Sequence, residues 1–216
     1  MTFRLLGAAL AVSLTAPAWA EENRLEGWFE AAVAKELGGG TFVQFQTQQR
    51  ARGRDNPIGD NQTYRLWLGH QFGKVEASAG IHRSKEGPQR ETRLMQQAGY
   101  SFGSTGLKGR TRLEQRFVDG AAQTGWRVRQ RIGYSLPLSS DGGGWKLSGN
   151  AEGFLTLRAT NRTGDTGITG LRTFVGFERG LGKLDLSLGY TRQQNIRKNR
   201  PDLVGHAPTL SVTLNL

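Results

Sequence analysis

The segment GWRVRQRIGYSL, residues 125–136, decides the fold class of this chain. Most of its even-numbered positions are apolar: Trp126, Val128, Ile132, Tyr134 and Leu136. The odd-numbered positions between them carry three arginines: Arg127, Arg129 and Arg131. Alternation with a period of two indicates a β-strand that has one apolar and one polar face. A helix, with 3.6 residues per turn, would mix the two sets around its circumference.

The same alternation continues on both sides of this segment. In residues 107–117, Arg110, Arg112, Glu114 and Arg116 share one face, opposite Leu113 and Phe117. Eleven such segments follow one another, and none has helical spacing: 26–37, 41–50, 62–73, 74–84, 89–103, 106–118, 124–137, 144–158, 167–180, 182–194 and 206–216. The sequence therefore predicts an all-β chain.

The connections between these segments alternate between tight and long. The tight ones are rich in glycine and lie at 38–40, 72–74, 103–106 and 180–182. The longer, polar ones lie at 51–61, 85–88, 119–124, 158–166 and 195–205. This alternation is typical of outer-membrane barrels. Because lipid cannot satisfy an open strand edge, we expect a closed antiparallel up-and-down transmembrane β-barrel with its charged faces inside.

A soluble β-sandwich or lipocalin-type barrel would alternate as well. Its core would then be formed by the faces rich in Ala, Gly and Thr, which would pack poorly. Aromatic residues near strand ends also favour the membrane: Phe117, Trp126, Tyr134 and Trp145. Trp126 and Tyr134 would lie roughly 20 Å apart along the membrane normal, close to the ~25 Å apolar band of such barrels.

The number of strands is the weak point of this prediction. Bacterial single-chain barrels have even strand numbers, so eleven segments imply ten wall strands or a twelfth that the pattern does not reveal. Five aromatic residues also fall on predicted interior faces: Trp28, Phe42, Trp67, Phe154 and Phe174. Three explanations are open: the inward and outward positions of these strands are wrongly assigned, β-bulges shift the alternation, or aromatic side chains fill the lumen.

The first twenty residues resemble a secretory signal. A positive start with Arg4 precedes the apolar run 5–16, and Ala18-Trp19-Ala20 fits a cleavage site. The alternative is an uncleaved anchor, but the run is shorter than the roughly 20 residues of a spanning helix. We expect cleavage after residue 20 and a single barrel domain, 21–216, in the outer membrane of a Gram-negative bacterium.

The composition narrows the class of protein further. The net charge is +11 and the chain has no cysteine, while the mean hydropathy is −0.51. A basic chain suggests nucleic-acid binding, but here the charges alternate with apolar residues and form neither a tail nor a helical patch. We therefore expect no nucleic-acid partner.

The run Arg110-x-Arg112-Leu113-Glu114-Gln115-Arg116-Phe117, followed by residues 126–129 and the acidic strand 150–154, resembles the domain-of-unknown-function family 2490. The resemblance spans most of the chain after residue 20, and the arginine strands are its specific part. It implies an outer-membrane β-barrel of unassigned role, and it implies no chemistry.

The arginine strands form a hairpin whose register can be estimated. If Arg116 faces Arg127, then Glu114 faces Arg129 and Arg112 faces Arg131. Like charges that face each other are unfavourable, so we expect Glu152 to reach this group, with Glu91 and Glu178 behind it. Two interpretations stay open: an ion-paired lumen that fills and stiffens a small barrel, or a narrow, anion-preferring passive channel for small solutes.

A second basic set lies on the long connections and is expected to face outward: Arg50, Arg52, Arg54, Arg83, Lys85, Arg90, Arg162, Arg197, Lys198 and Arg200. Guanidinium groups pair with phosphate, so contact with lipopolysaccharide phosphates is one interpretation and a solvated surface is the other. The expected partners are outer-membrane lipid, lipopolysaccharide and, during insertion, the barrel-assembly machinery. The oligomeric state is left open.

The only enzymatic candidate is the pair His82 and Ser84, which share a strand face as in some outer-membrane lipid hydrolases. Such a serine needs the imidazole as base and a third group to orient it, for which Glu86 or Glu91 would serve. Both residues point to the predicted interior, away from lipid. We expect no enzyme, no cofactor and no metal site, since His70 and His206 lack metal-ligand spacing.

Overall fold

The protein is an all-β chain in a computed structural model that describes residues 22–53, 59–103, 105–139 and 144–216. These residues form eleven strands: β1 (Glu22–Gly38), β2 (Thr41–Arg52), β3 (Asn61–Phe72), β4 (Val75–Glu86), β5 (Gln89–Ser101), β6 (Leu107–Val118), β7 (Gly125–Pro137), β8 (Lys146–Arg158), β9 (Gly167–Leu181), β10 (Leu184–Asn195) and β11 (Leu203–Asn215). The predicted export signal and Arg54 lie outside the described residues. Nothing in the described part is a helix long and apolar enough to cross a membrane.

The strands close into one barrel with the order β1-β11-β10-β9-β8-β7-β6-β5-β4-β3-β2. Consecutive strands pair antiparallel, whereas β1 and β11 pair parallel along eleven residue pairs, from Glu22 opposite Leu203 to Ala34 opposite Asn215. The predicted closed up-and-down barrel is thus confirmed, and its eleven strands in the described chain match the eleven segments of the sequence and lie within the predicted range of ten to twelve. Only the expectation of an even strand number is wrong. With an odd number, the first and last strands run in the same direction, so closure requires one parallel pair.

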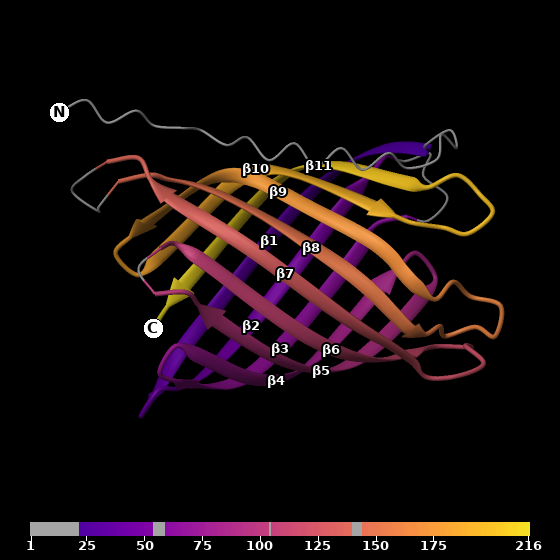
Figure 1. Cartoon of the computed structure of the whole chain (residues 1–216), viewed down its shortest axis with the longest axis horizontal. Helices are drawn as coiled ribbons and strands as arrows, with labels where there is room; N and C mark the ends of the chain where they lie inside the picture. Colours follow the sequence, from indigo (N-terminus) through magenta and orange to yellow (C-terminus); the bar gives the residue numbers. More distant parts are fainter. Residues whose placement is uncertain (1–21, 54–58, 104, 140–143) are drawn as a thin grey trace.

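Tight turns collect at one end of the barrel and most of the longer connections at the other (Figure 1). Gly40 and Gly73 have φ angles of 81° and 59°, a left-handed conformation that glycine adopts without strain. One connection differs from the prediction. Strands β4 and β5 are joined at the loop end by only Gly87 and Pro88, so this turn is as short as the turns that follow β1, β3 and β9 at the opposite end.

The wall is apolar outside and charged inside. Leu66, Ile132 and Val175 are 49%, 55% and 54% exposed on the outer surface. Glu114 and Glu152, which point into the barrel, are 0% and 1% exposed. Water-soluble proteins rarely expose large contiguous apolar patches. The molecule therefore has the opposite polarity to a soluble barrel.

The five inward aromatic residues of the sequence have more than one origin. Trp28, Trp67 and Phe154 are 6%, 3% and 5% exposed and fill the lumen. A β-bulge also follows Phe154, where the register of β8 with β9 shifts. Phe42 and Phe174 lie over inward-facing glycines, Phe42 over Gly69 and Phe174 over Gly176 and Gly189. Both the aromatic filling and one bulge are therefore present.

Candidate functional site: the charged lumen

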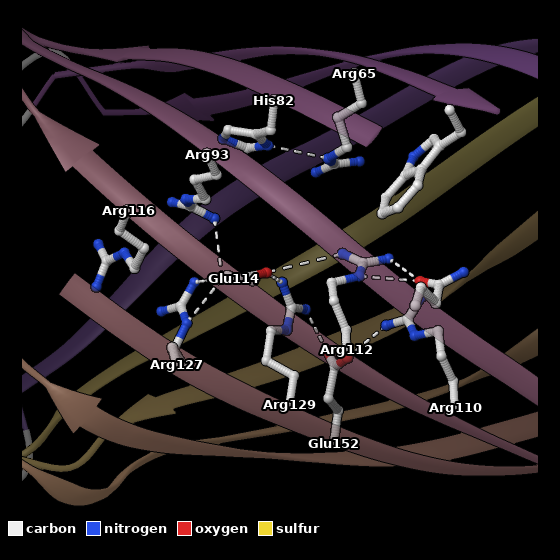
Figure 2. A network of polar contacts seen from close by, with 12 residues as sticks. Arg65, His82, Arg93, Arg110, Arg112, Glu114, Arg116, Arg127, Arg129 and Glu152 are labelled. Carbon is white, nitrogen blue, oxygen red and sulfur yellow. Dashed lines mark hydrogen bonds and ion pairs between the residues drawn. The ribbon is translucent and has the colours of Figure 1, made fainter. Parts of the chain in front are cut away.

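Glu114 is the centre of a network of ion pairs inside the barrel (Figure 2). It lies on β6, and its carboxylate accepts hydrogen bonds of 2.9 and 2.5 Å from Arg127 and of 3.0 Å from Arg129, both on β7. Arg93 on β5 and Arg112 on β6 lie 3.8 and 3.9 Å away. One buried carboxylate is therefore shared by four guanidinium groups.

Glu152 on β8 is the second acidic centre. It accepts hydrogen bonds from Arg129 and from Arg110, and Arg172 on β9 lies 3.7 Å away. Arg129 uses its two terminal nitrogens on different acids, Nη1 on Glu114 and Nη2 on Glu152. A continuous polar network therefore crosses strands β6 to β9.

Two more glutamates neutralise arginines at the edges of this network. Glu91 on β5 accepts hydrogen bonds of 2.6 Å from both Arg93 and Arg116. Glu30 on β1 accepts one of 3.1 Å from Arg65 on β3. The predicted entry of Glu152 and Glu91 into the arginine group is seen, whereas Glu178 instead accepts a hydrogen bond of 2.7 Å from Ser148.

Aromatic rings fill the space between the guanidinium groups. Arg112 stacks 4.7 Å from the ring centre of Trp67, which belongs to β3, three strands away. Phe154 has Arg129 at 4.7 Å and both Arg127 and Arg172 at 5.3 Å. Guanidinium groups are attracted electrostatically to aromatic faces. These rings therefore add a second stabilising contact to arginines that share their carboxylates with other guanidinium groups.

The side chains that meet across the middle of the barrel form a set that we call the lumen layer. It consists of Trp28, Glu30, Arg65, Trp67, Arg93, Met95, Arg112, Glu114, Arg127, Arg129, Glu152, Phe154 and Arg172. Sequence reasoning missed Arg65, Arg93 and Arg172 as members. Each is a single arginine in the inward phase of its strand, a signal that the more conspicuous arginine runs of β6 and β7 obscured.

The register of the arginine hairpin differs from the estimate by two residues. Glu114 lies opposite Arg127, Arg112 opposite Arg129 and Arg110 opposite Arg131, while Arg116 lies opposite Gly125. The predicted pairing of Arg116 with Arg127 is therefore wrong. The observed register places an acid rather than a base opposite Arg127 and leaves Arg116 free to reach Glu91 on the neighbouring strand.

Two cavities lie on either side of the lumen layer. The larger, which we call the turn-end cavity, has a volume of about 540 Å³ and reaches the exposed residues Gln71, Lys74 and Lys108 beside the tight turns. The smaller, the loop-end cavity, has a volume of about 210 Å³ and is lined by Asn61 and Gln89 near the opposite end. Arg65, Arg129 and Arg172 line both cavities. These three arginines therefore separate them.

Positive charge dominates both cavities. Eight arginines and lysines line the turn-end cavity against three glutamates. Eight arginines line the loop-end cavity against two glutamates. The described lumen is thus an interior in which cations outnumber the acids that neutralise them.

The second basic set divides into buried and exposed members. Arg52 lies inside the barrel mouth with ion pairs of 2.7 Å to both Glu26 and Glu86, and Arg50 stacks 4.0 Å from the ring centre of Trp28. Neither is the outward-facing loop residue that we expected, because β2 continues to Arg52 and its even-numbered residues point inward. Arg197 donates to Pro201 and Glu22. The exposed members are Arg83, Lys85, Arg90, Arg162, Lys198 and Arg200.

The pair His82 and Ser84 is buried, at 3% and 6% exposure. Nδ1 of His82 accepts a hydrogen bond of 3.3 Å from Arg65, and Nε2 has no partner among the described residues. The two glutamates that could orient such a base bind arginines instead, Glu86 with Arg52 and Glu91 with Arg93. The described residues thus supply Ser84 with no oriented base.

Together, the closed sheet and the lumen layer define a β-barrel whose interior holds buried, ion-paired arginines. A family model described as "Protein of unknown function (DUF2490)" matches residues 25–204, so the chain belongs to this family, as the arginine strands predicted. An uncharacterized protein of Methylorubrum extorquens is 31% identical over 116 residues, which cover 52% of this chain and 51% of that protein. The chain thus spans about half the length of this curated relative. No solved structure matches.

Proposed function

We propose that this protein is an outer-membrane β-barrel whose lumen is closed at mid-height, so that it serves as a structural wall element rather than as an open pore. The observation that carries the proposal is the lumen layer. Glu114 and Glu152 are almost fully buried by arginines from several strands, and Trp67 and Phe154 fill the gaps. Small barrels are commonly filled by their interior side chains in this way.

The membrane location is supported by the polarity of the wall. Leucine, isoleucine, valine and phenylalanine side chains cover its outer surface, and closure of the sheet pairs the strand edges that lipid could not satisfy. The aromatic residues Phe117, Tyr134 and Trp145 are exposed on the outside at 41%, 48% and 36%. Aromatic residues of this kind form the interfacial girdles of outer-membrane barrels.

Contact with lipopolysaccharide is part of the same proposal. Arg162, Lys198 and Arg200 are exposed on the long connections, and Arg200 lies 3.5 Å from Asp165. Arginine and lysine at this level would face phosphate groups of an outer leaflet, with which guanidinium pairs well. Arg50 and Arg52 do not belong to this surface, because Trp28, Glu26 and Glu86 occupy their guanidinium groups.

A narrow anion-preferring channel is the second candidate function. The excess of cations in both cavities favours it, since rings of arginine or lysine select anions in pores. The two candidates differ in whether the lumen layer lets ions pass.

Planar-bilayer recordings of the purified barrel separate the two candidates. A closed lumen predicts no conductance steps, whereas a general porin reconstituted in the same bilayers gives steps and serves as the positive control. Steps that carry chloride in preference to potassium would refute the closed barrel and support the channel.

A further inference from the structure

We propose that the turn-end cavity binds a small multivalent oxyanion, with Arg131 as the side chain that contacts it directly. The inference concerns binding only and goes beyond the proposed function. Anion binding does not depend on whether the lumen conducts ions, so a result that refutes the closed lumen does not refute anion binding, and the reverse is also true.

A row of cross-strand neighbours on the cavity wall contains more cations than acids. Arg110 on β6 lies opposite Arg131 on β7, Arg131 opposite Glu152 on β8, and Glu152 opposite Arg172 on β9. The row therefore contains three arginines and one glutamate. Like charges that face each other directly in a sheet are destabilising. A further negative charge beside this row would therefore stabilise it.

Arg131 is the arginine of this row that the protein leaves without a partner. Glu152 accepts hydrogen bonds from Arg110 and Arg129, and Arg172 donates two bonds, of 3.0 and 2.5 Å, to Gln193. The guanidinium group of Arg131 makes no hydrogen bond or ion pair with any described residue, although the residue is half-buried and lines the cavity. Its guanidinium is therefore available to an anion.

Buried nitrogens beside Arg131 lack acceptors as well. The Nε atoms of Arg110 and Arg129 are buried and have no hydrogen-bond partner among the described residues. Both arginines line the same cavity. A buried polar group without a partner costs free energy. Three neighbouring arginines of one cavity thus keep donors that the protein itself does not satisfy.

The cavity has the access and the size that a small ligand needs. Lys74 and Lys108 are exposed beside the tight turns and line the cavity where it reaches solvent. Their charges would draw an anion toward the arginines, because clefts lined by one sign of charge concentrate the opposite ion. The volume of about 540 Å³ lies within the range of ligand sites.

The chemistry of the lining identifies the class of ligand. Guanidinium groups pair bidentately with carboxylate and phosphate, and Gln46, Gln97 and Asn150 add neutral hydrogen-bonding groups. Little of the lining is apolar apart from Phe42, Trp67 and Tyr100. A compact molecule with two or more phosphate or carboxylate groups fits this surface, whereas a large apolar ligand does not.

Isothermal titration of the full chain, folded in detergent micelles, tests the inference. Pyrophosphate and citrate are the two probes, each titrated at constant ionic strength against sodium chloride. We expect saturable binding of at least one probe and at least tenfold weaker binding by Arg131→Gln. Arg162→Gln is the matched control, because it removes the same charge from an exposed connection outside the cavity.

Arg131→Gln should fold, since it breaks no ion pair and relieves repulsion with Arg110. Lys108→Gln, at the cavity mouth, is the second variant and is expected to weaken binding about threefold. Binding of one probe alone supports the inference and identifies the oxyanion as phosphate or carboxylate. The inference is overturned if the wild-type chain binds neither probe, or if Arg131→Gln binds as tightly as Arg162→Gln.

Discussion

Replacing Glu114 by glutamine removes the negative charge that four arginines share. The substitution keeps the shape of the side chain, so it isolates charge from packing. Arg127 and Arg129 donate three hydrogen bonds to this carboxylate. In the variant, the amide NH₂ group would face guanidinium donors, and only one oxygen could still accept.

The expected loss of stability is large because Glu114 is 0% exposed. Removing one partner of a buried ion pair typically costs about 3–5 kcal/mol, since the remaining charge stays buried without compensation. Glu152 cannot replace the lost charge, because it already binds Arg110 and Arg129. We therefore expect Glu114→Gln to lower the free energy of unfolding by about 3–5 kcal/mol.

Equilibrium urea unfolding in phospholipid vesicles, followed by tryptophan fluorescence, measures this loss. Glu22→Gln is the control: the side chain of Glu22 is 49% exposed and lies 3.4 and 3.2 Å from Arg24 and Arg197. Exposed pairs contribute about 0.2–1 kcal/mol, so the control should change stability little. A loss for Glu114→Gln as small as that of the control would refute the view that Glu114 holds the lumen layer together.

Two further substitutions test packing inside the barrel. Phe154→Ala removes the ring on which Arg127, Arg129 and Arg172 stack. We expect it to lower the free energy of unfolding by about 3–5 kcal/mol, as for other buried phenylalanines. An unchanged urea midpoint would show that the ring does not fill the lumen. Gly189→Ala would place a Cβ 2.3 Å from the carbonyl oxygen of Val175 on β9. Overpacking of this kind costs about 1–3 kcal/mol, and the heat-modifiable band in detergent gels should convert at a lower temperature than that of the wild type.

The faces of the strands could be predicted from the sequence, but their register could not. Alternation separates inward from outward residues, so Arg112, Glu114 and Arg129 were placed correctly on the inside. A slip of two residues keeps every side chain on its face. The pattern therefore could not distinguish Arg127 opposite Arg116 from Arg127 opposite Glu114, and the connection at 119–124 gave no independent constraint.

The alternation of polar and apolar residues also could not predict the parallel pairing of β1 with β11 or the exact ends of the strands. The segment at β1 alternates like any other, and only its pairing with β11 shows that an odd number of strands can close. Arg50 and Arg52 are predicted to belong to the outward-facing basic set, whereas β2 extends to Arg52 and both side chains point inward. Glu26 and Glu86, which neutralise Arg52, come from two other strands, so no local signal indicates this contact.

Sided labelling of introduced thiols tests most directly whether the lumen layer closes the barrel. The chain has no cysteine, so Ser78→Cys places a single thiol in the turn-end cavity and Asn61→Cys places one in the loop-end cavity. In vesicles with one defined orientation, a charged thiol reagent should label position 78 only from the tight-turn side and position 61 only from the loop side. Rapid labelling of either position from both sides would show a continuous water path and contradict a closed lumen.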